Sequence, residues 1–132
     1  MNKQEFTSKF KDILSQYVTR TVEGHLGSDD DIKKADFNGV YALLDNNEVI
    51  YIGSAYPSSF KVKDRLYLYR SAHPSNVCLA KQLMCERNLT REQVQQYMKT
   101  LDFIAFENFS LEYYLIKNCD GLVNKKGYKN SR

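Results

Sequence analysis

Two tyrosines flank a short polar segment in the first half of the chain, and their spacing points to chemistry. Tyr41 ends the string Gly39-Val40-Tyr41, and Tyr51, ten residues later, begins the string Tyr51-Ile52-Gly53. A phenol can relay or accept a proton when a neighbouring cation lowers its pKa. The sequence therefore offers two candidate proton-handling groups, provided that the fold brings both to one face with a cation beside them.

Positive charge is concentrated in two blocks of the sequence. The net charge of the 132-residue chain is only +3. Residues 61–91, however, carry seven basic residues against two acidic ones, and residues 117–132 carry five against one. A solvated face explains many such blocks, and a surface for an anionic polymer is the alternative.

The tyrosines lie in a segment, 39–53, whose pattern predicts a β-hairpin around Asp45-Asn46-Asn47. A two-residue turn would set Tyr41 opposite Ile52 and put the tyrosines on opposite faces. A three-residue loop sets Tyr41 opposite Tyr51, with Asn47 in a left-handed conformation, and we expect this register because it separates an apolar face from one with polar tips. The apolar face would be Val40, Ala42, Leu44, Ile50 and Ile52, and the other face Tyr41, Leu43, Val49 and Tyr51.

The first 37 residues divide into a helical part and an irregular part. Apolar residues recur at helical spacing from Phe6 to Val18, which predicts a helix over residues 3–19. Residues 20–37 have no periodicity and contain turn formers, so we expect a surface connection there.

The second half of the chain reads as helices with one strand. Ser59, Ser75 and Thr90 are expected to cap helices that run to about Ser71, through Arg87 and to about Leu101. Residues 101–106 form an apolar run of strand length, and Ser110 is expected to cap a last helix over 111–118. The order predicts an α+β domain with a small three-stranded antiparallel sheet flanked by helices and an extra N-terminal helix.

The two tripeptides resemble the hairpin that names the GIY-YIG nuclease superfamily. Other residues follow in the family's order: Arg65 on the helix after the hairpin, Glu112 on a later helix, and Asn124 close behind. The string His73-Pro74-Ser75-Asn76 is similar to the histidine segment of the phage homing enzymes of this family. The resemblance covers about residues 38–125 as a catalytic module, with 1–37 as an N-terminal helix and connection and 126–132 as a basic tail.

The resemblance implies a role for each matched residue. Glu112 would hold a divalent cation, Mg²⁺ or in its place Mn²⁺, because magnesium suits one carboxylate with several waters. Arg65 would clamp the scissile phosphate with two donors, and Arg70 is its rival for that role. Tyr41 or Tyr51 would serve as the base.

Other residues have less defined roles. His73 is either a base or a loop residue before a proline. Ser54 stands where repair-type members often carry a lysine, so a cationic helper would be Lys61 or Lys63. Tyr69, one turn beyond Arg65, either contacts phosphate or packs. The residues expected to bind nucleic acid are Lys61, Lys63, Tyr69, Arg70, Lys81 and Asn124.

The resemblance implies a metal-dependent DNA endonuclease that hydrolyses phosphodiester bonds. The alternative is a nucleic-acid-binding protein of the same fold that does not cut. Neither a membrane span nor the basic-then-apolar pattern of a secretory signal is found in the sequence, so we expect no membrane partner and a cytoplasmic location. The apolar stripe of the first helix is expected either to pack on its own domain or to form a homo-oligomer.

Overall fold

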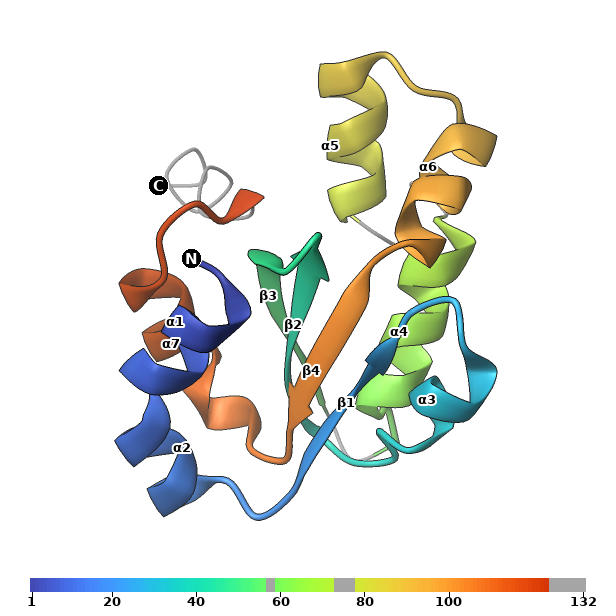
Figure 1. The fold of residues 1–132 in the computed structure, drawn as a ribbon. Helices are drawn as coiled ribbons and strands as arrows, with labels where there is room; N and C mark the ends of the chain where they lie inside the picture. Colours follow the sequence, from blue (N-terminus) through green and yellow to red (C-terminus); the bar gives the residue numbers. More distant parts are fainter. Residues whose placement is uncertain (57–58, 73–77, 124–132) are drawn as a thin grey trace.

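The computed structural model describes residues 1–56, 59–72 and 78–123, and these form a four-stranded sheet between two helical layers (Figure 1). The strands are β1 (Thr21–His25), β2 (Gly39–Asp45), β3 (Glu48–Ala55) and β4 (Asp102–Phe106). Their order across the sheet is β1-β4-β2-β3, and each neighbouring pair is antiparallel. β1 and β3 are therefore the two edge strands.

The helices divide between the two faces of the sheet, as Figure 1 shows. One layer comprises α1 (Lys3–Lys9), α2 (Lys11–Tyr17) and α7 (Glu112–Asn118). The other comprises α3 (Asp29–Lys33), α4 (Val62–Ser71), α5 (Cys78–Arg87) and α6 (Arg91–Lys99). Each layer has its own apolar cluster against the sheet. Both faces of the hairpin are thus buried, which is why β2 is apolar along nearly its whole length.

The α+β class is confirmed, but the sheet has four strands, and the expectation of three is wrong. The additional strand is β1, within the stretch 20–37 that was expected to be a surface connection and that also contains α3. Along β1 the residues alternate between exposed and partly buried, because it is an edge strand with little cover. Its polar Glu23 and His25 therefore give no apolar pattern from which a strand could be predicted.

Several helix boundaries differ from the prediction. The helix expected over 3–19 is broken at Phe10, whose φ and ψ of −101° and 11° lie outside the helical region. α4 begins after Lys61 rather than at Ser59, because the Asp64 carboxylate accepts a hydrogen bond from the Lys61 amide at 2.9 Å. The Thr90 cap is confirmed, since its hydroxyl accepts from the Gln93 amide. The cap expected at Ser75 lies outside the described residues.

The start of α7 is also different from the prediction. A short 3₁₀ turn, Phe109–Leu111, precedes it, and Leu111 occupies the N-cap position without a side-chain hydrogen bond. The Ser110 hydroxyl bonds to the Asn108 side chain at 2.6 Å instead of capping the helix. The expected Ser110 cap is therefore wrong, although Glu112 does lie in the first turn of the helix.

The register of the hairpin differs from both registers considered above. Asn46 and Asn47 both have positive φ, 49° and 72°, as a two-residue turn of the hairpin type requires, so the left-handed Asn47 is confirmed. The ladder then slips by one residue, from Leu44 opposite Val49 to Leu43 opposite Tyr51. Tyr41 consequently lies opposite Gly53, and the expected pairing of Tyr41 with Tyr51 is wrong.

The slip is a β-bulge at Ile50, and it decides which residues share a face. Tyr41 and Tyr51 both pack toward α4, so the prediction that the tyrosines share a face is confirmed. Val49 and Ile50, however, lie on the faces opposite to those predicted. A two-residue turn alone would put Tyr51 on the face opposite Tyr41. The extra residue at Ile50 returns Tyr51 to the same face as Tyr41.

The apolar stripe of the N-terminal helices packs on its own sheet. Phe6 and Phe10 are buried in the cluster with Val40 and Phe106, and the Phe6 ring stacks 6.2 Å from that of Phe106. The apolar stripe that led us to expect a homo-oligomer is therefore covered within one chain. None of the helices in the described ranges is long and apolar enough to cross a membrane.

Candidate active site

The two glycines of the hairpin each allow a close approach that a side chain would prevent. A Cβ on Gly39 would lie 2.0 Å from the Phe106 carbonyl oxygen of β4. A Cβ on Gly53 would lie 2.4 Å from the Tyr41 hydroxyl oxygen. The first glycine lets strands approach closely, and the second lets the Tyr41 phenol lie across β3.

The Tyr41 phenol is buried in a group of three tyrosines that meet at Tyr69 of α4. Its hydroxyl donates to the Tyr69 hydroxyl at 2.8 Å, and the two rings are 5.5 Å apart. Tyr51 lies against the same Tyr69 ring, at 5.6 Å, and is only partly buried. Burial raises the pKa of Tyr41 against the lowering effect of Arg65, and burial together with the two neighbouring tyrosines raises the pKa of Tyr69, so both phenols stay protonated at neutral pH.

Arg65 lies over this group, on the first turns of α4. Its Nε donates to the Tyr41 hydroxyl at 3.4 Å, and its guanidinium carbon is 5.4 Å from the centre of the Tyr69 ring. Desolvation opposes the charge of Arg65, but interactions with Tyr41 and Tyr69 outweigh it and raise the pKa of the guanidinium. Arg65 is thus a permanent, partly buried cation held by an aromatic surface.

Glu112 reaches the same edge of the sheet from the opposite layer, since α7 and α4 both contact β3. Desolvation raises the pKa of the Glu112 carboxyl, while a hydrogen bond with the Ser54 side chain and the charge of Arg65 act to lower it. A partly buried carboxylate and a partly buried guanidinium therefore act on one another across the edge strand.

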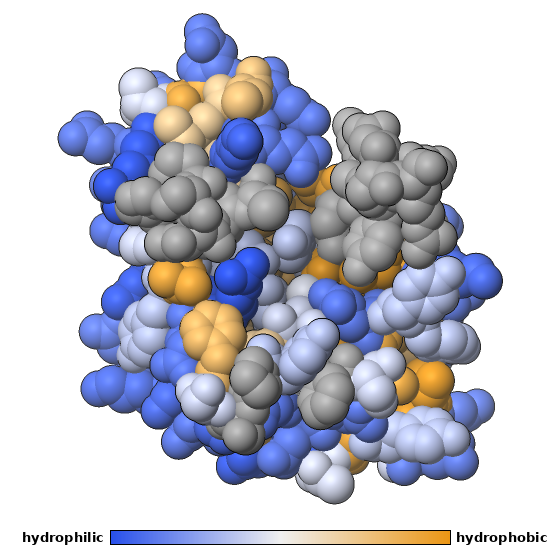
Figure 2. Space-filling view, turned by 180° about the vertical axis from the view of Figure 1, so that it is seen from behind, coloured by the Kyte–Doolittle hydropathy of each residue, from blue (hydrophilic) through white to orange (hydrophobic). Residues whose placement is uncertain are grey.

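This side of the molecule is the one seen in Figure 2, since β3 lies toward the rear in Figure 1. Blue and white polar residues cover the middle of that face, and orange apolar residues gather beside them. A polar centre with an apolar surround is the setting in which electrostatic interactions are strengthened.

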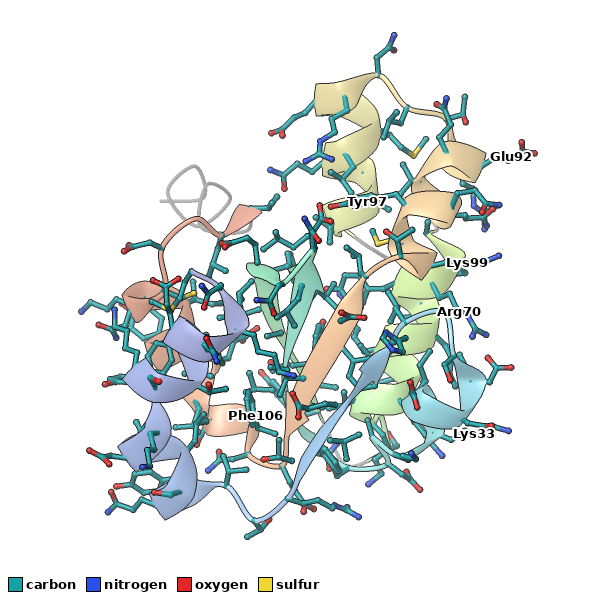
Figure 3. The ribbon with its side chains drawn as sticks, in the orientation of Figure 1. Lys33, Arg70, Glu92, Tyr97, Lys99 and Phe106 are labelled. Atoms are coloured by element: carbon teal, nitrogen blue, oxygen red, sulfur yellow. The ribbon has the colours of Figure 1, made fainter. Side chains whose placement is uncertain are left out.

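The other basic residues predicted to bind nucleic acid are spread more widely. Lys61 forms the N-cap of α4, and the Lys63 ammonium pairs with Asp36 at 3.4 Å. Arg70 pairs with Asp29 of α3 and lies on the outer side of the helical layer, away from β3 (Figure 3). Lys81 is exposed on α5. Arg65, and not Arg70, is therefore the arginine that the structure brings beside Tyr41 and Glu112.

Two predicted residues, His73 and Asn124, lie outside the described residues. Sequence reasoning also missed one contact, the hydrogen bond between Ser54 and Glu112. The available signal was strand alternation, because Ser54 follows Gly53 and must point to the face opposite the tyrosines, where α7 packs.

The surroundings of Glu112 suit it to hold a single metal ion. Within the described ranges there is no group of three or more His, Cys, Asp or Glu side chains that could hold a metal ion. A magnesium site of the expected kind uses one carboxylate with waters and substrate phosphate, so it needs no such group. Glu112 fits that requirement: it is partly buried, oriented by Ser54 and placed beside a phosphate-binding type of side chain.

A second polar cluster lies at the other edge of the sheet. The His25 Nδ1 contacts the Asp102 carboxylate, and Lys3 pairs with Glu23 at 2.5 Å. The Asp31 carboxylate accepts from the His25 amide at 2.9 Å, above Gly24. These groups line a polar cavity of about 320 Å³. All the pairs are largely exposed, as is usual for surface ion pairs.

Comparison with known proteins identifies no relative. No family model, no curated protein and no solved structure matches the chain.

Proposed function

We propose that this chain is a metal-dependent DNA endonuclease of the GIY-YIG superfamily. The observation that carries the proposal is the meeting of Arg65, the tyrosine group and Glu112 at strand β3, from three separate parts of the chain. An arginine, a phenol and a single carboxylate are the groups that phosphodiester hydrolysis requires for charge stabilisation, proton handling and cation binding.

Arg65 is the group proposed to bind the scissile phosphate. Its Nε donates to the Tyr41 hydroxyl and its guanidinium carbon lies over the Tyr69 ring, and these two contacts orient the guanidinium. A planar, pre-oriented fork matches phosphate oxygens, and its charge acts most strongly on the transition state, where negative charge on those oxygens is greatest.

Tyr41 and Tyr51 are proposed to have different roles in the reaction. Tyr41 is 1% exposed and its pKa is raised, so it serves to position Arg65 rather than to meet substrate. Tyr51 is partly exposed on the same face and is the phenol that water and phosphate can reach. Tyr51 is therefore the better candidate for orienting the attacking water and handling its proton.

Glu112 is the residue that would hold Mg²⁺. A bound magnesium ion supplies positive charge against phosphate oxygens and lowers the pKa of coordinated water. Ser54 contributes by holding the carboxylate in its ionised form, since its hydrogen bond lowers the Glu112 pKa against the effect of burial.

The test is nicking of supercoiled plasmid in the presence of Mg²⁺, with Glu112→Gln as the principal variant. We expect nicking to fall by about a thousandfold or more in this variant, while salt-dependent DNA binding persists, because only the cation ligand is removed. Chelation with EDTA should stop the unmodified protein, and Mn²⁺ should restore it.

Glu23→Gln is the matched control, because it makes the same chemical change in an exposed carboxylate at the other edge of the sheet. Its nicking rate should equal that of the unmodified chain. Full activity in Glu112→Gln would refute the assignment of this residue. Salt-dependent DNA binding with no cleavage in either metal would instead support the binding protein that does not cut.

A further inference from the structure

The outer side of β1 carries backbone groups that the sheet itself does not use. At the two ends of its ladder with β4, the Leu26 amide donates to the Leu101 carbonyl and the Glu107 amide donates to the Arg20 carbonyl, each at 2.9 Å. Because the hydrogen-bonded pairs of an antiparallel ladder alternate, the even-numbered residues of β1 face β4 and the odd-numbered residues face outward. The outward residues are Thr21, Glu23 and His25.

The chain covers one end of this outer side and leaves the other end open. The His25 amide donates to the Asp31 carboxylate at 2.9 Å, and the His25 carbonyl accepts from the Ser28 amide at 3.0 Å. The amides and carbonyls of Thr21 and Glu23 have no such partner among the described residues, and both residues are exposed. An uncovered strand edge is a template for pairing with another strand.

We propose that this edge pairs with the same edge of a second copy of the chain, so that two four-stranded sheets join into one continuous sheet. The two β1 strands run antiparallel about a two-fold axis at Val22, with Thr21 of each copy opposite Glu23 of the other. Main-chain hydrogen bonds hold a strand added in this way, and the axis gives both copies the same contacts. The inference goes beyond the proposed function and does not rest on it.

The open backbone groups favour this register. Pairing Thr21 with Glu23 of the second copy, and the reverse, forms two hydrogen-bonded pairs that use every open amide and carbonyl of the edge. A register centred on Glu23 would require His25 to give up both of its backbone bonds. It would also set two glutamates directly opposite each other, which destabilises a sheet. The edge is therefore complementary to itself when the axis lies at Val22.

The side chains of β1 also suit the two-fold arrangement. Val22 is partly buried and packs against the apolar cluster on the α4 side of the sheet. At the axis it faces Val22 of the second copy as a pair without hydrogen bonds, with Cα atoms about 4.5 Å apart, so that each valine covers the other. Glu23 lies on the opposite face and keeps its ion pair with Lys3 of its own chain, at 2.5 Å.

The candidate active sites stay open in this dimer. β1 and β3 are the opposite edges of each sheet, so the two β3 strands become the outermost strands of the joined sheet (Figure 1). Pairing through two residues on each strand buries little surface, so we expect association at about micromolar concentrations rather than a tight dimer.

Sedimentation equilibrium of the full chain, from about 1 to about 200 µM, measures association in this range. Thr21→Lys should lower the dissociation constant of the dimer and Thr21→Glu should raise it, each by about fivefold, because each places a charge opposite Glu23 in both pairs. Thr21→Pro should abolish association, because it removes an outward amide and leaves the ladder with β4 intact.

Thr7→Lys and Thr7→Glu are the matched controls, because Thr7 is an exposed threonine of α1 and the changes in charge are the same. Both should leave the dissociation constant within about twofold of the unmodified value. Circular dichroism checks the fold of each variant. If Thr21→Pro is unfolded, the opposite shifts expected from the two charged Thr21 variants still decide the question.

Val22→Cys tests the position of the axis. Two cysteines that face each other there lie within the Cα separation of a disulfide, so mild oxidation should give a cross-linked dimer. Thr21→Cys should give no more cross-linking than the unmodified chain, because its two copies are offset along the strands. The native cysteines are the same in both variants.

A chain that stays monomeric over the whole range would overturn the proposal and would leave the edge to a strand of another protein. A dimer that the Thr21 variants do not change, or that both charges weaken alike, would place the interface elsewhere. Cross-linking of Thr21→Cys but not of Val22→Cys would overturn the register.

Discussion

The two edge strands of the sheet share one structural feature but differ in the groups that surround it. At each edge a glycine lets a side chain lie across the strand: a Cβ on Gly53 would meet the Tyr41 hydroxyl at 2.4 Å, and one on Gly24 would meet the Asp31 Cβ at 2.5 Å. At β1 the result is a set of exposed charges that pair with one another. At β3 Arg65 donates to the Tyr41 hydroxyl, lies over the Tyr69 ring and acts on the Glu112 carboxyl.

The contrast shows what separates a candidate site from a surface cluster. Both edges are rich in polar groups, and at the β1 edge the Lys3–Glu23 and His25–Asp102 pairs join exposed side chains. At β3, by contrast, an arginine and a carboxyl lie partly buried. Desolvation raises the pKa of the Glu112 carboxyl, and desolvation of Arg65 is outweighed by the tyrosines, which raise the pKa of its guanidinium. Partial burial of charged groups with shifted pKa values is typical of sites that act on a ligand.

After Glu112→Gln, the largest loss of nicking is expected from changing the chemistry of Arg65 while keeping its charge. Arg65→Lys should slow plasmid nicking by about a hundredfold or more, because an ammonium cannot reproduce the bidentate fork. Arg70→Lys, in which the arginine is paired with Asp29 on the outer side of α4, should remain within about twofold of the unmodified rate. A greater loss in Arg70→Lys than in Arg65→Lys would show that Arg70, on the outer side of α4, contacts the phosphate.

The two glycine positions should differ in the stability that they require. Gly53→Ala should lower the free energy of unfolding by about 2–3 kcal/mol, because the Tyr41 phenol is buried and has no room to move. Gly24→Ala should cost about 1 kcal/mol, since Asp31 lies on a short surface helix that can shift. Urea denaturation measures both, and a larger loss for Gly24→Ala would reverse the comparison.

Removing the Tyr41 hydroxyl should separate its role in positioning Arg65 from the packing of its ring. Tyr41→Phe should lower the free energy of unfolding by about 1 kcal/mol, since Tyr69 loses a buried hydrogen-bond partner while the ring remains. Nicking should slow as Arg65 loses its orienting contact. Tyr51→Phe, by comparison, should slow nicking with little change in stability. Unchanged nicking in both variants would exclude the tyrosines from the reaction.

The pH dependence of nicking should reflect the titration of the Glu112 carboxyl. The pKa of its carboxyl is raised by desolvation, so activity should fall on acidification at a higher pH than an ordinary glutamate would give. Ser54→Ala removes a hydrogen bond that lowers this pKa, and should move the acid limb further upward. An acid limb that stays in place in Ser54→Ala would show that another group controls it.

Stability should change in the opposite sense to activity over that pH range. Since the folded pKa of Glu112 is raised, the stabilisation that this group gives is complete below the pKa of the unfolded chain. It is lost as pH rises through the folded value. Titration of Glu112 should therefore not unfold the protein in acid, and circular dichroism across the acid limb of the activity profile distinguishes the two effects.

The smallest effects are expected at the β1 edge. His25→Gln and Asp102→Asn should each change the free energy of unfolding by less than about 1 kcal/mol, because both side chains are largely exposed. Neither should alter plasmid nicking. A nicking defect in either variant would give the β1 edge a functional part and remove the contrast between the edges.

The parts of the fold that could be predicted are those with a local signal. The hairpin followed from its β-branched residues and its asparagines, and the α6 cap from Thr90 and Gln93. β1 could not be predicted, because an exposed edge strand places polar residues at most of its positions and its pairing with β4 joins residues far apart in sequence. The 3₁₀ turn before α7 likewise depends on tertiary packing rather than on Ser110.

The candidate site was predictable as a set of residues but not as a geometry. The order of Tyr41, Arg65 and Glu112 along the chain identified the groups. Their roles depend on burial, which one sequence does not give: Tyr41 lies beneath Arg65, and Glu112 approaches from the other helical layer. Strand alternation places Ser54 on the face toward α7, but its hydrogen bond with Glu112 could be assigned only once α7 was known to pack there.

The bulge at Ile50 makes the segment between the two tyrosines one residue longer than a regular two-residue hairpin needs. Ile50 stands between Val49, opposite Leu44, and Tyr51, opposite Leu43, and has no place of its own in the ladder with β2. Removing Ile50 would leave Tyr51 opposite Leu43 and Gly53 opposite Tyr41, so both phenols would keep their face. Removing Ile52 would instead make Tyr51 and Gly53 neighbours on opposite faces of the strand. In divergent copies of this chain, loss of one residue should therefore be tolerated at Ile50 and not between Tyr51 and Gly53, a pattern that selection on amino-acid type alone would not produce.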